Sequence, residues 1–102
     1  DVDALQHPGV QWLLDTRNLS SLRDGRRRLM WVVFHAVKNA EKIGSKDGMV
    51  RFLCAWNKAA GKPYDDKDVR HMVSNQWDKL YTPSDTYINE LFLEIGREDL
   101  TR

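Results

Sequence analysis

Three consecutive arginines, Arg26 to Arg28, follow Gly25 at the start of a segment whose apolar spacing predicts a helix. Arginine side chains bind phosphate groups, and the run places concentrated positive charge at one end of that helix. The unpaired backbone amides of a first helical turn favour an anion in the same place. The segment therefore predicts an anion-binding module, with a nucleic acid or a nucleotide as its ligand.

A stripe of basic and aromatic residues continues from the arginine run along the same helix. Its members follow one another at spacings of four, four, three and four and so share one face: Arg27, Trp31, His35, Lys38 and Lys42. Cations of such a stripe can contact phosphates while the indole ring stacks on a base, which contributes about 1–3 kcal/mol per base. Alternatively, Trp31 packs beneath a neighbouring helix and the cations form a solvated face.

A second basic stripe, Arg51, Lys58 and Lys62, has spacings of seven and four on the following helical segment. Antiparallel packing of the two helices would join both stripes into one groove. Affinity for a polyanion in such a groove would fall with salt, because each bound phosphate releases counterions. The alternative is that these three cations serve solubility alone.

Nothing in the sequence builds a catalytic or metal site. The three histidines are far apart and lack the spacing of helical metal ligands. Clustered Asp65, Asp66 and Asp68 can hold magnesium, but capping of a helix start explains them better. Cys54 stands among apolar residues, which indicates a buried structural thiol. We therefore expect no catalytic residue, no metal and no cofactor, and ATP or another nucleotide only as a ligand.

Length, charge and composition describe a single small domain. The chain has 102 residues and a formal net charge of +1. Residues 17–62 hold eleven Lys or Arg and three Asp or Glu, a net of +8, and the remainder carries −7. This split would attract polyanions to one side of the domain, unless it arises by chance. No apolar run approaches the ~20 residues that span a bilayer, so we expect a cytoplasmic protein without a membrane partner. Because the chain begins with Asp1, we expect a fragment of a larger replication protein.

The periodicity of apolar residues predicts an all-α fold, a compact bundle of about five helices. The predicted helices cover residues 8–17, 25–43, 46–60, 66–80 and 85–95. The second buries a stripe of Leu29, Val33, Ala36, Val37 and Ala40, and the fourth buries Val69, Met72, Val73, Trp77 and Leu80. Residues 97–102 are expected to fray.

Capping residues set the ends of these helices. The predicted amino-terminal caps are Asp24, Ser45, Asp65 or Asp66, and Ser84. The predicted carboxy-terminal stops are Gly44, Gly61 and Gly96, each in the left-handed conformation that glycine adopts without strain.

Several short motifs occur in a defined order between residues 24 and 77. Gly25 and the arginines open one helix, Ala55-Trp56-Asn57 ends the next before Pro63-Tyr64, and Asp68-Val69 starts a third. This order resembles the helix-bundle domain that lies carboxy-terminal to the catalytic core in primases of plasmids, phages and archaeal mobile elements. In that family an asparagine stands where this chain has Arg28, and a glutamate is commoner at the position of Asp68.

The resemblance implies an accessory module without an active site of its own. Such a module binds single-stranded template and an initiating nucleotide and presents them to the catalytic primase-polymerase domain of the same chain. The matching positions point to Arg26, Arg27 and Asn57, whereas Trp31, His35 and Lys38 come only from the helical-face argument.

Together these observations predict a non-catalytic domain of a DNA primase that binds single-stranded DNA and a nucleotide. The predicted binding residues are Arg26, Arg27, Arg28, Trp31, His35, Lys38, Lys42, Arg51, Asn57 and Lys58. One alternative is a helical domain that binds an acidic protein partner. A second is a reader of double-stranded DNA that uses Lys67, Arg70, Asn75 and Gln76, although nearby aspartates would face phosphate.

Overall fold

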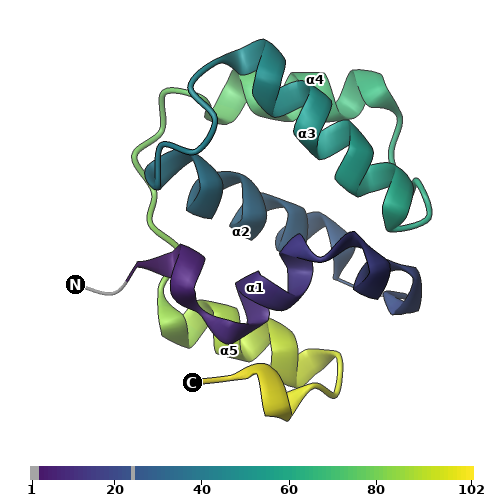
Figure 1. Ribbon diagram of the computed structural model, residues 1–102, viewed down its shortest axis with the longest axis vertical. Helices are drawn as coiled ribbons and strands as arrows, with labels where there is room; N and C mark the ends of the chain where they lie inside the picture. Colours follow the sequence, from purple (N-terminus) through teal and green to yellow (C-terminus); the bar gives the residue numbers. More distant parts are fainter. Residues whose placement is uncertain (1–2, 24) are drawn as a thin grey trace.

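The computed structural model describes residues 3–23 and 25–102 (Figure 1). Within these ranges the chain forms helices and no strand, which confirms the all-α prediction. The α-helices are α1 (Pro8–Leu14), α2 (Arg26–Asn39), α3 (Lys46–Ala59), α4 (Asp66–Gln76) and α5 (Asp85–Glu94). Short 3-10 turns, η1 (Ala4–Gln6), η2 (Thr16–Ser21) and η3 (Glu98–Leu100), complete the bundle.

Helix α2 forms the centre of the bundle, with α3 on one side and α1 and α5 on the other (Figure 1). Its buried residues run almost without interruption from Leu29 to Val37 because neighbours cover it on several sides. Helix α4 packs chiefly against α3 and buries only Val69 and Val73. None of the helices in these ranges is both long and apolar enough to cross a membrane.

The carboxy-terminal end of α2 differs from the prediction. The helix ends at Asn39 rather than near Gly44, and the left-handed residue is Glu41, with φ of 56°. The amide of Lys42 donates to the carbonyl oxygen of Val37 at 3.2 Å, and that of Glu41 to Lys38 at 3.0 Å. These two bonds form a Schellman motif, which satisfies carbonyls of the last turn and places the left-handed residue three positions before Gly44.

The glycine stops of α3 and α5 are confirmed. Gly61 has φ of 91° and Gly96 has φ of 76°, and each is followed by a residue whose amide closes the helix in the same six-to-one pattern. Ser45 and Ser84 cap α3 and α5 through their side chains, also as predicted. Asp65 occupies the N-cap position of α4 without a side-chain bond.

At the start of α2, the predicted cap Asp24 lies outside the described residues. Gly25 occupies the N-cap position with φ of 71° and supplies no side chain to cap the helix. At the end of α4, Leu80 lies beyond the helix and is 91% exposed, so its predicted place in the core is wrong.

The chain after α5 is ordered by specific contacts, contrary to the predicted fraying. The guanidinium of Arg97 lies 4.9 Å from the ring centroid of Trp12 and pairs with Asp99. Arg102 makes two hydrogen bonds to Asp85, and its backbone amide and carbonyl both bond to the Asn89 side chain. Helix α1 ends at Leu14 rather than near the predicted Arg17, and η2 (Thr16–Ser21) includes the predicted loop at residues 18–21.

Candidate functional site

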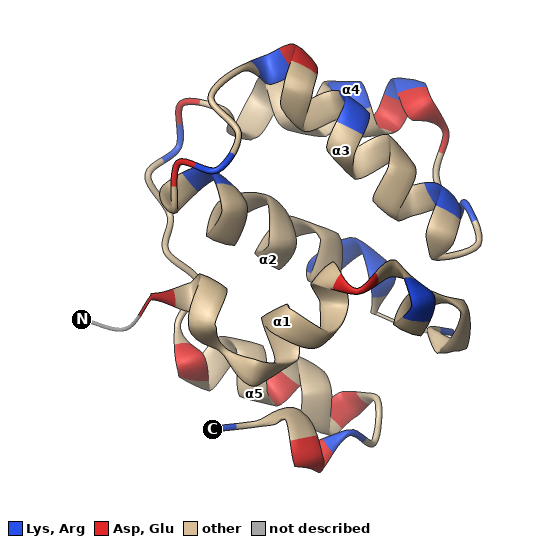
Figure 2. Ribbon diagram, viewed as in Figure 1, with Lys and Arg blue, Asp and Glu red and all other residues tan. Residues whose placement is uncertain are grey.

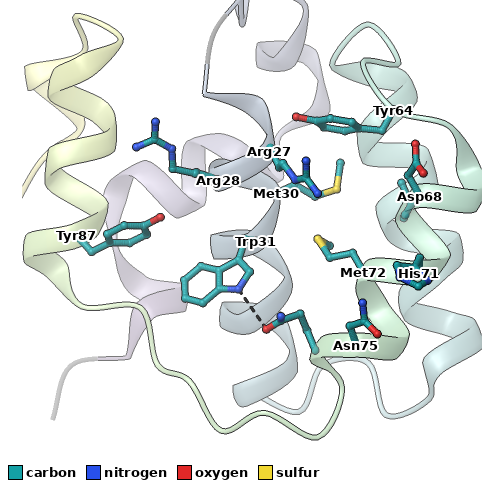
Figure 3. A pocket seen from close by; sticks show the side chains of 12 residues that line it. Arg27, Arg28, Met30, Trp31, Tyr64, Asp68, His71, Met72, Asn75 and Tyr87 are labelled. Carbon is teal, nitrogen blue, oxygen red and sulfur yellow. Dashed lines mark hydrogen bonds between the residues drawn. The ribbon is translucent and has the colours of Figure 1, made fainter.

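A cavity of about 560 Å3 lies between α2, α4 and the start of α5 (Figure 3). It exists because α4 packs on α3 and stays apart from α2, so that long side chains rather than backbones bridge the gap. Three aromatic residues line it: Trp31 from α2, Tyr64 from the loop before α4, and Tyr87 from α5. The polar lining is Arg27, Arg28, Asp68, His71, Asn75 and Gln76, and the remaining lining residues are Met30, Val69 and Met72.

The three consecutive arginines point to three different partners. Arg26 donates to the carbonyl oxygen of Ala60 at the end of α3. The guanidinium carbon of Arg27 lies 5.8 Å from the ring centroid of Tyr64, and Arg28 pairs with Glu94 of α5 at 3.5 Å. This divergence follows from helix geometry, because successive side chains are about 100° apart around the axis. Arg27 and Arg28 line the pocket, and Arg26 does not.

Trp31 is half-buried and forms one wall of the same pocket as Arg27 (Figure 3). Its indole N–H donates to Gln76 Oε1 at 3.3 Å. The ring centroids of His35, Tyr87 and Tyr81 lie 4.6, 5.8 and 6.0 Å from its own. The ring is thus held by an aromatic cluster while it remains part of a cavity lining.

His35 is fully buried, which corrects its predicted position on an exposed binding face. Its ring packs against Trp31, Phe34 and Tyr81, and its Nε2 lies 3.2 Å from Gln76 Oε1. Burial lowers the pKa of His35 below its ordinary value; the Gln76 bond opposes this and the charge of Lys38 adds to it. The residue is therefore a neutral core histidine and offers no charge to a phosphate.

Asn57 is also fully buried, so it reaches the pocket only through another residue. Its side-chain amide donates to the carbonyl oxygen of Tyr64 at 2.6 Å. That bond fixes the loop that carries Tyr64, which lines the pocket. The structure thus makes Asn57 a positioning residue rather than a ligand contact.

The other predicted cations lie away from this cavity. Lys38 donates to the carbonyl oxygen of Lys79 at 2.6 Å and so ties the α4–α5 connection to α2. Lys42, Arg51 and Lys58 are exposed and do not line the pocket. The pocket lies on the α4 side of α2, and Arg27 is the one cation of the two basic stripes among its lining residues.

Several residues that line the pocket are not among the predicted binding residues. Tyr87 comes from α5, which is remote in sequence from α2. On α4, Met72 is predicted as a core residue, and Asn75 and Gln76 are predicted only as contacts to double-stranded DNA. A signal was available on α4, because Asp68, Met72, Asn75 and Gln76 recur at helical spacing on one face.

Within residues 3–23 and 25–102, no group of three or more His, Cys, Asp or Glu residues could hold a metal ion. Cys54 is half-buried rather than fully buried. Burial and the neighbouring Asp66 raise the pKa of its thiol, so the thiol stays protonated at neutral pH. Neither feature adds chemistry to the pocket.

Comparison of the chain with protein-family models, curated proteins and solved structures gives no match.

Proposed function

We propose that this domain binds single-stranded DNA and holds one nucleotide of the strand in the pocket between α2 and α4. The observation that carries the proposal is that Arg27 and Trp31, one helical turn apart on α2, line the same cavity (Figure 3). One turn is about 5.4 Å, which suits a base beside the indole and its phosphate beside the guanidinium. The volume of about 560 Å3 falls in the range of small-ligand sites.

The charged residues of the pocket indicate which wall the phosphates of a bound strand would follow. Arg27 and Arg28 lie on the α2 side, and Asp68 lies on the α4 side (Figure 3). Phosphates would follow α2, where the exposed ion pair of Arg28 with Glu94 is weak enough to exchange for a phosphate. Figure 2 supports this placement, since acidic residues gather along α5 and basic residues at the start of α2.

The motif order between residues 24 and 77 supports a place for this module beside the catalytic core of a cytoplasmic primase or primase-polymerase. In that setting the domain performs no chemistry. It captures template, and with it ATP or another initiating nucleotide, for the catalytic domain.

Fluorescence anisotropy of labelled single-stranded DNA with Arg27→Gln and Arg51→Gln tests the proposal. Both substitutions remove one exposed arginine charge, but only Arg27 lines the pocket. We expect Arg27→Gln to weaken binding about 10-fold and Arg51→Gln to change it less than 2-fold. Each phosphate contact contributes about 0.7 to the slope of log affinity against log salt, so the slope should fall by this amount in Arg27→Gln alone.

Two outcomes would overturn the proposal. Absence of binding at low salt removes the function altogether. Equal losses in the two variants indicate attraction by overall charge without a pocket. A labelled polyglutamate peptide in the same assay tests the rival acidic partner, which predicts peptide binding that DNA does not displace.

A further inference from the structure

The orientation of the Gln76 side chain is fixed by the chemistry of its two neighbours. An indole N–H can only donate, so the Gln76 atom 3.3 Å from Trp31 Nε1 must be the carbonyl oxygen. His35 Nε2 lies 3.2 Å from that same oxygen and must therefore carry its proton. A half-turn of the amide would set its NH2 group against the indole N–H of Trp31 and break that bond.

This arrangement leaves the amide nitrogen of Gln76 to the pocket. Both neighbours use the oxygen, and Nε2 has no hydrogen-bond partner among the described residues. Gln76 lines the cavity next to Trp31. The site thus presents two N–H donors, in a fixed position, beside the ring on which a base would stack.

We infer that Gln76 donates a hydrogen bond from its side-chain amide to an acceptor on the bound base, a carbonyl oxygen or a ring nitrogen. This inference rests on the proposed function and deepens it by naming the edge of the base that is read. The buried, neutral His35 acts through Gln76, because its N–H holds the glutamine oxygen. Asn75 also lines the pocket, but no described residue bonds to its amide, which leaves it free to turn.

Two substitutions distinguish the loss of the Gln76 N–H donor from the effect of an added negative charge. In Gln76→Glu the carboxylate can still accept from Trp31 and His35, but it offers no N–H to a base. Asn75→Asp introduces the same charge in the same pocket without touching those partners. A thymine pentamer and a pentamer of difluorotoluene, a thymine isostere without carbonyl acceptors, serve as probes.

The measured quantity is the ratio of the two dissociation constants, difluorotoluene over thymine, for each protein. We expect Gln76→Glu to lower this ratio about 3- to 10-fold relative to the wild type, and Asn75→Asp to leave it unchanged. If Gln76→Glu and Asn75→Asp give equal ratios while DNA binding still depends on Arg27, this inference is overturned and the proposed function is not. If the wild type binds neither pentamer, the proposed function is overturned, and this inference with it.

A measurement on the wild type does not depend on how the variants fold. We expect the side-chain amide signals of Gln76 in a nitrogen–proton correlation spectrum to shift on addition of the thymine pentamer, and to shift less with the isostere. The same response to both pentamers would exclude a base contact by this amide.

Discussion

The guanidinium of Arg26 donates a hydrogen bond to the carbonyl oxygen of Ala60 at 3.2 Å, across 34 positions of sequence. This bond satisfies a carbonyl at the end of α3 and joins that end to the start of α2. Arg26 is thus a structural residue next to two arginines that line a pocket.

Arg26→Ala should therefore lower the free energy of unfolding by about 1–2 kcal/mol, since it removes a charge-assisted bond. Arg28→Ala removes only an exposed ion pair and should cost about 0–1 kcal/mol. Urea unfolding measures both. Unchanged stability in Arg26→Ala, with a loss of DNA affinity equal to that of Arg27→Gln, would contradict the structural role.

Gly9 in α1 touches the ring of Phe92 in α5, and a methyl group at this position would overlap the ring. Gly9→Ala should destabilise the domain by about 1–3 kcal/mol through overpacking. Gly44→Ala is the control, because no atom lies within 4 Å of the added carbon. Thermal denaturation should show a midpoint lower by about 4–8 °C per kcal/mol in the first variant and little change in the second. Equal midpoints would refute the close packing of α1 on α5.

Glu41 is in the left-handed conformation at the end of α2, with φ of 56°. Glu41→Gly should raise the unfolding free energy by about 1 kcal/mol because glycine adopts this conformation without strain. Gly96→Ala makes the opposite change at φ of 76°, where no neighbour lies within 4 Å, and should destabilise by a similar amount. Chemical denaturation measures the unfolding free energy of both variants. A lower stability of Glu41→Gly would show that α2 ends at another residue.

Burial lowers the pKa of His35 in the folded state below its ordinary value near 6.5. Above this value both states are neutral and the fold keeps its full stability. As pH falls below it, the unfolded chain takes up a proton that the folded chain does not. Stability should then fall with a slope of up to about 1.4 kcal/mol per pH unit. Denaturation of the wild type and of His35→Gln between pH 8 and pH 5 measures this contribution. If the unfolding free energy depends on pH in the same way in both proteins, the prediction is contradicted.

Asp68 lines the pocket, whereas Asp66, in the same first turn of α4, is exposed and does not. Removing the pocket charge should strengthen DNA binding, because a carboxylate near the bound phosphates repels them. We expect Asp68→Asn to bind about 3-fold more tightly and Asp66→Asn to bind as the wild type does. Anisotropy titration compares them, and identical affinities would place the strand away from α4.

Helical periodicity is sufficient to predict five helices, because each carries apolar residues at helical spacing. It gave the angle of a side chain around its own axis but not what covers that side chain. His35 and Trp31 share a face of α2 as expected, yet Tyr81 and Gln76 come from distant sequence to cover the histidine. Sequence periodicity therefore predicts which residues share a face of α2, but not which residues of α4 and the α4–α5 connection cover them.

Local capping signals predict the serine caps of α3 and α5 and two of the three glycine stops. Gly61 and Gly96 end their helices as predicted, whereas α2 closes at Glu41 although Gly44 follows. The arginines are consecutive in sequence, but consecutive helical positions diverge, so of these three only Arg27 and Arg28 line the pocket.

The two helical walls of the pocket differ in how many of their residues are buried. Helix α2 is buried along most of its length, whereas α4 buries only Val69 and Val73. Regions with few buried contacts open locally at lower free energy than the core, so amide hydrogens of α4 should exchange faster than those of α2. A DNA strand that contacts both walls would reduce this difference in exchange rate. Ligand binding would then be detected as slower amide exchange in α4 rather than as a change of shape.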